Sequence, residues 1–182
     1  MLCHLDALDA QLAALDHRLE QVGRSEPWSD PVRWLCCFRG VSVRTALGLL
    51  AEIGDFRRFG SARELMGFLG LTPTEYSSGE SRHRGHITKA GNEHARRLLV
   101  EAAWHYRHAP RASARASAQH PFVPAAVPAR AWVAQVRLHE RHRHLTAHGK
   151  RSTVANVAVA RELAGFLWAA MTDQALREEV AA

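Results

Sequence analysis

The stretch VRWLCCFRGVSVRTALGLLAEIG, residues 32–54, decides the fold of this chain. It predicts a helix, a tight turn at 39–42 and a second helix over 43–53. Apolar residues recur with helical spacing in the second half, and Gly54 suits a left-handed residue that ends a helix. The chain is therefore expected to be built from helices joined by short turns.

This pattern resembles a helix-hairpin-helix, a motif in which backbone N–H groups of the turn hold a DNA phosphate without reading its sequence. Gly40, Val41 and Ser42 are accordingly candidate nucleic-acid-binding residues. The usual motif has glycine on both sides of the aliphatic residue, whereas Ser42 stands at the second position here and limits close approach. A hairpin that only packs a core is the alternative.

The N-terminal segment, residues 1–30, is predicted to be a coiled-coil helix and a linker. Its apolar residues have heptad spacing. They are Leu5, Leu8, Leu12, Leu15, Leu19 and Val22. A coiled coil implies a homo-oligomer, and the alternative is an amphipathic helix packed on its own domain.

Residues 31–182 are predicted to form an all-α domain that follows the coiled coil. Ser61 and Glu64 have the spacing of a capping box that starts a helix, and Asn92 is placed to open another. Two further helices are expected at 130–147 and 152–171, after an irregular basic connection at 109–129. No stretch alternates with period two, so no substantial sheet is expected.

Composition sets the broad class of the protein. With 182 residues and 47% hydrophobic content, the chain can bury one core. It has no 18-residue apolar run and no signal-peptide pattern, so no membrane association is expected. Residues 81–151 contain 14 Lys or Arg against three Asp or Glu, whereas the whole chain carries a net charge of only +6. Such a basic block is typical of a surface that binds nucleic acid.

The segment GLTPTEYSSG, residues 70–79, reads as a loop rich in small and hydroxyl residues. It precedes Arg82, Arg84 and Lys89, so a nucleophilic hydroxyl and a phosphate could meet there. Tyr76 is a rival nucleophile to the serines on chemical grounds.

Four segments together resemble the C-terminal transposase domain of the IS110/IS116/IS902 family. They are FRGVSVRTALGLLAEIGDFRRF, LMGFLGLTPTEYSSGESRHRGHITKAGN, ARRLLVEAAWHYRH and HGKRSTVANVAVARELAGFLWAAM. The resemblance implies a serine that attacks DNA during strand cleavage and rejoining in transposition. By position that serine is Ser78, with Ser77 as the adjacent alternative.

The resemblance also implies partners. In this family a separate RuvC-like domain carries the acidic ligands for Mg²⁺, and a structured guide RNA directs the recombination of DNA. This chain begins inside the coiled coil, so we expect an enzyme part that is incomplete without a RuvC-like half and binds no cofactor itself. A location in the bacterial cytoplasm, at the nucleoid, follows from the same resemblance.

The residues predicted to contact nucleic acid are mostly basic. They are Gly40, Val41, Ser42, Arg82, Arg84, Lys89, Asn92, Arg96, Arg97, Lys150 and Arg151. No metal site is predicted: His144 and His148 have a chelating spacing, but no carboxylate or cysteine set completes four ligands nearby. Two alternatives to an enzyme are a non-catalytic nucleic-acid-binding module and a coiled-coil assembly protein.

Overall fold

The computed structural model describes residues 2–78 and 81–173, and only their backbone at residues 2, 3, 76–78, 81–84, 115 and 120. The chain is mostly helical, as predicted. Its α-helices are α1 (Leu2–Val22), α2 (Ser29–Cys36), α3 (Val43–Ile53), α4 (Ala62–Phe68), α5 (Glu93–Ala103), α6 (Ala114–Ser117), α7 (Ala126–Ala147) and α8 (Ser152–Thr172). Three short 3₁₀ turns are η1 (Phe56–Arg58), η2 (Trp104–Arg107) and η3 (His120–Phe122).

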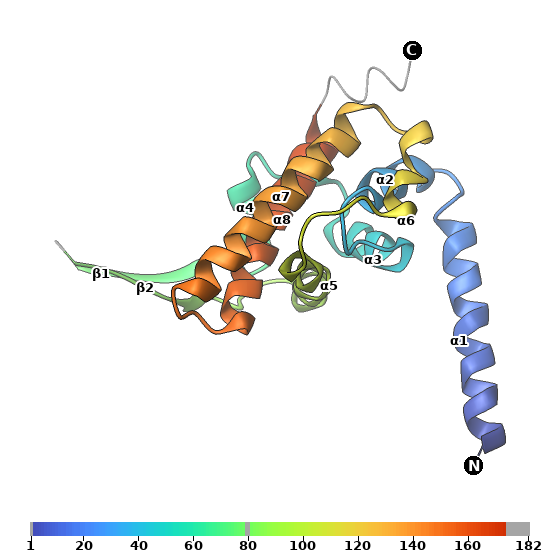
Figure 1. Cartoon of the computed structure of the whole chain (residues 1–182), viewed down its shortest axis with the longest axis horizontal. Coiled ribbons are helices and arrows are strands. Elements are labelled where there is room, and N and C mark those ends of the chain that lie inside the picture. The colour runs from blue at the N-terminus through green and yellow to red at the C-terminus, as the bar shows by residue number, and fades with distance from the viewer. Residues whose placement is uncertain (1, 79–80, 174–182) are drawn as a thin grey trace.

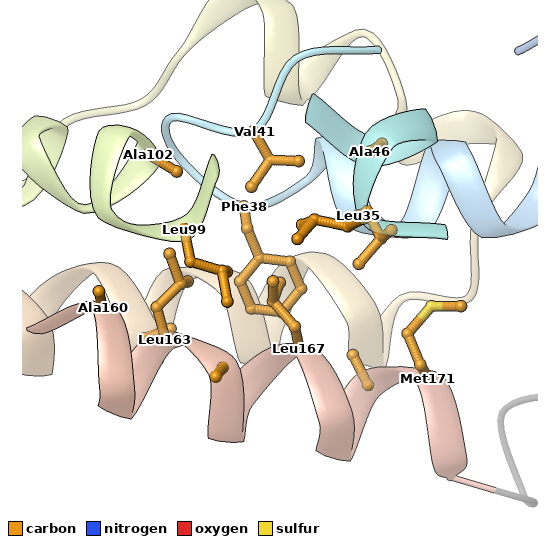
Figure 2. Packing of buried hydrophobic residues seen from close by; sticks show 14 of the residues in the cluster. Leu35, Phe38, Val41, Ala46, Leu99, Ala102, Ala160, Leu163, Leu167 and Met171 are labelled. Atoms are coloured by element: carbon orange, nitrogen blue, oxygen red, sulfur yellow. The ribbon is translucent and has the colours of Figure 1, made fainter. Parts of the chain in front are cut away.

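Helix α8 is the centre of the body, with α4, α5 and α7 packed along it (Figure 1). By length and composition it is apolar enough to cross a membrane, but half of its most apolar stretch of 18 residues is buried inside the protein. Its hydropathy is therefore that of a core helix. Figure 2 shows Leu163 and Leu167 of α8 facing Phe38 and Leu99 from the neighbouring elements.

Three helices begin at polar caps, and those at Ser61 and Asn92 confirm the sequence prediction. The side chain of Ser42 accepts a hydrogen bond from the Thr45 N–H, and Ser61 does the same for Glu64. The Asn92 side chain accepts from the Ala95 N–H at 2.9 Å. Each bond satisfies a backbone donor that the first turn of a helix leaves without a partner.

The segment predicted as a serine loop is instead a β-hairpin. Strands β1 (Pro73–Ser78) and β2 (Ser81–Ile87) pair antiparallel and project from the helical body (Figure 1). A ribbon that leaves the body has no core to face, and both strands are mostly polar on both faces. The alternation of apolar and polar residues that marks a half-buried strand is therefore absent.

The connection at 109–129 is shorter than predicted. It contains α6, η3 and the first residues of α7, which begins at Ala126 rather than Arg130. Pro128 is compatible with this start, because the first residues of a helix have no intrahelical partner for their N–H groups.

Helix α1 runs away from the body and touches it mainly along α3 (Figure 1). Arg44 holds it there through a hydrogen bond of 2.6 Å to Asp16 Oδ2. Leu12 and Leu15 of its heptad seam remain 58% and 55% exposed. A coiled coil needs a partner helix, so this prediction stays open in a single chain.

Candidate nucleic-acid interface

The hairpin fixes the backbone positions of the candidate nucleophiles. In the register, Ser77 lies opposite Arg82 and Ser78 lies opposite Ser81, at the far end of the described ribbon. Glu75 lies opposite Arg84. Because positions alternate across a strand, Ser77, Arg82 and Arg84 occupy one face of the ribbon and Ser78 the other.

Side chains of these residues lie outside the part of the chain that the structure describes. This applies to Tyr76, Ser77, Ser78, Arg82 and Arg84. The choice between Ser77 and Ser78 as the nucleophile therefore stays a prediction, now with a distinct ribbon face for each serine.

A bulge separates the outer part of the hairpin from its base. The register shifts between the pairs Pro73–Ile87 and Glu75–Arg84. Gly85 lies at this shift, and a Cβ atom there would overlap Thr74 Oγ1. That hydroxyl donates a 3.0 Å hydrogen bond to the His86 carbonyl, which fixes the bulge.

Two glycines, Gly70 and Gly91, allow the chain segments at the base of the hairpin to cross closely. The Asn92 N–H donates to the Phe68 carbonyl at 2.8 Å, and the Lys89 N–H donates to the Gly70 carbonyl at 3.1 Å. A Cβ atom at Gly91, whose φ is 140°, would overlap the Phe68 carbonyl oxygen. Only glycine fits such an approach, so the hairpin leaves the body from a fixed crossing.

Arg96 holds this crossing from α5. Its Nη1 donates to the carbonyls of Leu69 at 3.0 Å and Lys89 at 3.2 Å, one on each side of the hairpin. Lys89 itself has a φ of 54°, unusual for a residue with a side chain. Arg96 was predicted to contact nucleic acid, and the structure gives its guanidinium a structural role between the two segments.

Asn92 also has a structural role. Its Nδ2 donates to Glu52 Oε2 at 2.7 Å, and His94 Nδ1 lies 2.7 Å from Glu52 Oε1. The hydrogen bond from Asn92, and then that from His94, lower the pKa of Glu52. A carboxylate thus lies beside the start of α5, where the sequence suggested that a phosphate could bind.

A groove of about 970 Å³ lies between the base of the hairpin and the start of α8. Its charged lining is mostly basic and includes His86, Lys89, Arg141, Arg161 and Glu162. The acidic side chain among them, Glu162, forms an ion pair of 3.1 Å with Arg137, which does not line the groove. The groove therefore offers a positive surface beside the hairpin.

Arg141 and Arg161 were not among the binding residues predicted from the sequence. A signal was present for Arg161: it and Glu162 are the charged residues of an otherwise uncharged helix, α8. No signal distinguished Arg141 from the other basic residues of α7, because its approach to the hairpin arises from the packing of α7 on α8.

The turn between α2 and α3 differs from an exposed phosphate-binding loop. Val41 is buried, and Ser42 caps α3 with its side chain. Gly40 has a φ of 83°, and a Cβ atom there would overlap the Ala102 carbonyl oxygen of α5. Phosphate binding by Gly40, Val41 and Ser42 stays a prediction, while the structure gives all three residues a packing or capping role.

The remaining predicted residues are exposed. Arg97 lies on the surface of α5, 3.7 Å from Glu101. Lys150 and Arg151 lie in the turn into α8, and Arg151 is two residues before Thr153, where the part of α8 that lines the basic groove begins. These three side chains are accessible to a polyanion.

The histidines of α7 engage different partners. His139 Nδ1 lies 3.1 Å from the Tyr106 carbonyl, and His142 Nε2 lies 3.4 Å from Ser152 Oγ. His144 and His148 stack, with ring centroids 4.1 Å apart. Within the described residues, no group of three or more His, Cys, Asp or Glu side chains is arranged to hold a metal ion. The Mg²⁺ that the resemblance implies for a RuvC-like half therefore has no fitting ligand set among the described residues of this chain.

Comparison with known proteins identifies the family. The Transposase IS116/IS110/IS902 family model matches residues 33–119, which begin within α2, extend through α6 and include both strands of the hairpin.

Curated relatives extend the match beyond that segment. A putative transposase, y4qE, of Sinorhizobium fredii is 52% identical over 135 residues, which are 74% of this chain and 35% of the relative. The transposase for insertion sequence element IS1533 of Leptospira borgpetersenii is 31% identical over 144 residues, 79% of this chain and 42% of the relative. The chain thus spans about two fifths or less of the length of these relatives. Through residues 33–119, the chain belongs to the IS116/IS110/IS902 transposase family.

Proposed function

We propose that this chain is the DNA-binding C-terminal part of an insertion-sequence transposase and supplies the serine nucleophile for strand cleavage and rejoining. The supporting observation is the hairpin, which projects from a rigid crossing and carries Ser77 and Ser78 at its far end (Figure 1). A hydroxyl at such a position can reach a phosphate of a DNA duplex that rests on the body.

In the proposed reaction the Ser78 hydroxyl oxygen attacks the scissile phosphorus. A bond forms between the serine oxygen and phosphorus, and the bond from phosphorus to the leaving sugar oxygen breaks. The serine loses its proton and the sugar oxygen gains one, so the product is a phosphoserine link and a free sugar hydroxyl. Rejoining reverses these changes with a different sugar hydroxyl as the attacking group.

The cationic residues act on charge rather than on bonds. Arg82 and Arg84 lie on the strand paired with the serines, at positions on the ribbon face of Ser77 and opposite that of Ser78, and Lys89 lies in the basic groove at the base. Cations near the phosphorus stabilise the additional negative charge of the transition state. Lys89, Arg141 and Arg161 would hold the flanking phosphates.

The complete reaction needs partners beyond this chain. We propose that a RuvC-like half, a structured guide RNA and a second copy of the chain join it on DNA, in the bacterial cytoplasm at the nucleoid. Mg²⁺ would be held by the RuvC-like half, since the described residues of this chain have no fitting ligand set for it.

A covalent-adduct trap tests the proposal. The chain is mixed with a RuvC-like half, guide RNA and nicked target DNA from a related element, then denatured and analysed by peptide mass spectrometry. We expect a DNA adduct on Ser78 that is lost in Ser78→Ala and kept in Ser77→Ala. The reverse pattern would move the role to Ser77, which lies on the ribbon face of Arg82.

A full-length relative serves as the positive control. If it forms an adduct while the wild-type chain binds DNA and forms none, the chain is a non-catalytic nucleic-acid-binding module and the proposed chemistry is wrong.

A further inference from the structure

A cavity of about 590 Å³ lies at the opposite end of α5 from the hairpin. Its walls come from the α2–α3 turn, from the α5–η2 junction and from the connection that leads to α6. Since α5 has 11 residues, the two ends of this helix are about 16 Å apart. The cavity is therefore distinct from the hairpin and its groove.

The ionisable lining of the cavity is mostly basic. Arg39, His105 and Arg111 contribute to it, and Glu101 is the acidic residue among the described lining residues. Glu101 lies 3.7 Å from Arg97 on the outer surface of α5. Two arginines and a histidine thus share the cavity with one carboxylate, which lies beside Arg97.

The basic groups destabilise one another's charge. Burial and then the charge of Arg111 lower the pKa of Arg39. Burial and then the charge of Arg39 lower the pKa of His105, with smaller effects from His108 and Arg107. An anion in the cavity would relieve this repulsion, because it stabilises every cation around it.

Arg39 is held in place without using all of its donors. Its Nη1 donates to the carbonyls of His108 at 3.3 Å and Ala109 at 2.9 Å, and to Gln135 Oε1 at 2.9 Å. Gln135 is buried and also accepts from the Arg111 backbone N–H at 3.1 Å, so one side chain of α7 holds the guanidinium of Arg39 and the backbone of Arg111. These bonds occupy one of the three guanidinium nitrogens and leave donors for a phosphate.

An exposed aromatic side chain lies in an adjoining hollow of about 380 Å³. Arg39, Ala112, Ser113 and Ala116 line both spaces, and Trp132 of α7 lines the hollow. Trp132 is 48% exposed, although it is a large apolar residue in the middle of a helix. Cationic and aromatic groups side by side are the means by which proteins hold a strand whose bases are unpaired.

We propose that this cavity and the adjoining hollow form a second nucleic-acid site, which binds a strand with unpaired bases. Arg39, His105 and Arg111 contact its phosphate, and a base stacks on Trp132. The space suits one or two nucleotides, because pockets of 300–1,000 Å³ are the size that accepts small ligands. The inference rests on the proposed function in one respect, namely that the chain binds nucleic acid.

Fluorescence anisotropy on the whole chain tests the site. Labelled 12-nucleotide single strands of DNA and RNA are compared with a blunt DNA duplex for the wild type, Arg111→Ala and Trp132→Ala. Arg63→Ala removes the same charge from the exposed surface of α4, which does not line the cavity, and is the matched control. Unfolding midpoints of all four proteins establish that the variants remain folded.

Arg111→Ala is expected to weaken single-strand binding more than Arg63→Ala and to reduce the slope of log affinity against log salt by about 0.7. Trp132→Ala is expected to weaken single-strand binding at least about fivefold while duplex binding changes little. A preference for RNA or for DNA identifies the source of the strand, and either result supports the site.

Two results would overturn the inference while the proposed function stands. One is wild-type binding to nucleic acid that neither Arg111→Ala nor Trp132→Ala weakens beyond the Arg63→Ala control. The other is an equal loss of strand and duplex binding in Trp132→Ala, which would exclude base stacking. A wild-type chain that binds no nucleic acid at all would contradict the proposed function as well.

Discussion

The serine hairpin and the α2–α3 turn were both predicted from sequence to contact nucleic acid, but the hairpin is exposed whereas the turn is packed against the body. The hairpin extends from the body, so its far end is remote from the core (Figure 1). The turn is packed against the C-terminal end of α5, where Gly40 lies on the Ala102 carbonyl. In both regions a glycine allows two backbone segments to pack closely.

This difference shows what a glycine-rich turn does and does not indicate. At Gly91 the close approach anchors two segments whose continuation is exposed, and at Gly40 it buries the turn itself. The sequence pattern is similar because both sites need a positive φ and no side chain. Exposure to a ligand is decided by the segments that follow the glycine.

Substitution of Gly40 should have the largest effect on stability. Gly40→Ala places a methyl group against backbone that cannot move aside and strains a φ of 83°, so we expect a loss of about 2–4 kcal/mol in the free energy of unfolding. Gly54→Ala is the matched control, since Gly54 has a φ of 68° but no atom within 4 Å of the added carbon. Urea denaturation measures both.

Gly54→Ala should cost about 1–2 kcal/mol, the conformational term alone. Equal losses in the two variants would mean that the turn yields to the methyl group, and the contrast between a packed turn and a free hairpin would then disappear.

Helix α1 extends the comparison to a second element that leaves the body. The exposed apolar seam of α1 is expected to be buried against a partner, whereas the polar hairpin can remain in contact with solvent. We expect Leu12→Asp to abolish self-association of the chain, because burial of each leucine in a seam contributes about 1.5–3 kcal/mol. Ala10→Asp, which lies off the seam on the same helix, should leave the association unchanged.

Light scattering across a concentration series measures the association. A wild-type chain that stays monomeric at the highest concentration would contradict the coiled coil, and the exposed seam would then need another partner.

The helices were largely predictable, because caps and periodic apolar residues act locally. Ser61 and Asn92 were recognised from sequence and do cap helices, whereas the cap at Ser42 was found in the structure. The hairpin was not predictable as strands, since it lacks a buried face. The role of Arg96 and the cluster around Arg39 depend on contacts between residues far apart in sequence, such as Arg39 and Gln135, and nothing local encodes them.

Removal of the Arg96 side chain should separate the two regions. Arg96→Ala deletes both carbonyl contacts at the hairpin base and leaves the α2–α3 turn untouched, with an expected loss of about 1–3 kcal/mol. Hydrogen exchange followed by mass spectrometry should show faster exchange over 69–90 and unchanged protection of α3. Arg97→Ala, on the adjacent exposed position, is the control. Uniformly faster exchange would mean that the hairpin base and the body form one cooperative unit.

The smallest expected effect is a pH dependence confined to the body. Burial, then the charges of His139 and Arg107, lower the pKa of His142 from its ordinary value of 6.5. The unfolded chain therefore gains a proton first as pH falls, so the stability from neutral His142 is full above pH 6.5 and is lost as pH falls through the lower, folded value.

His142→Gln should flatten the decline of the unfolding midpoint between pH 7 and pH 5, while His148→Gln, on the exposed end of α7, should leave the decline as it is. Hydrogen exchange over β1 and β2 should not respond to either substitution, because the side chain of His142 extends from α7 toward Ser152 at the start of α8. An unchanged decline in His142→Gln would assign the pH response to another group. His105 is then the next to test, since burial and the neighbouring Arg39 lower its pKa as well.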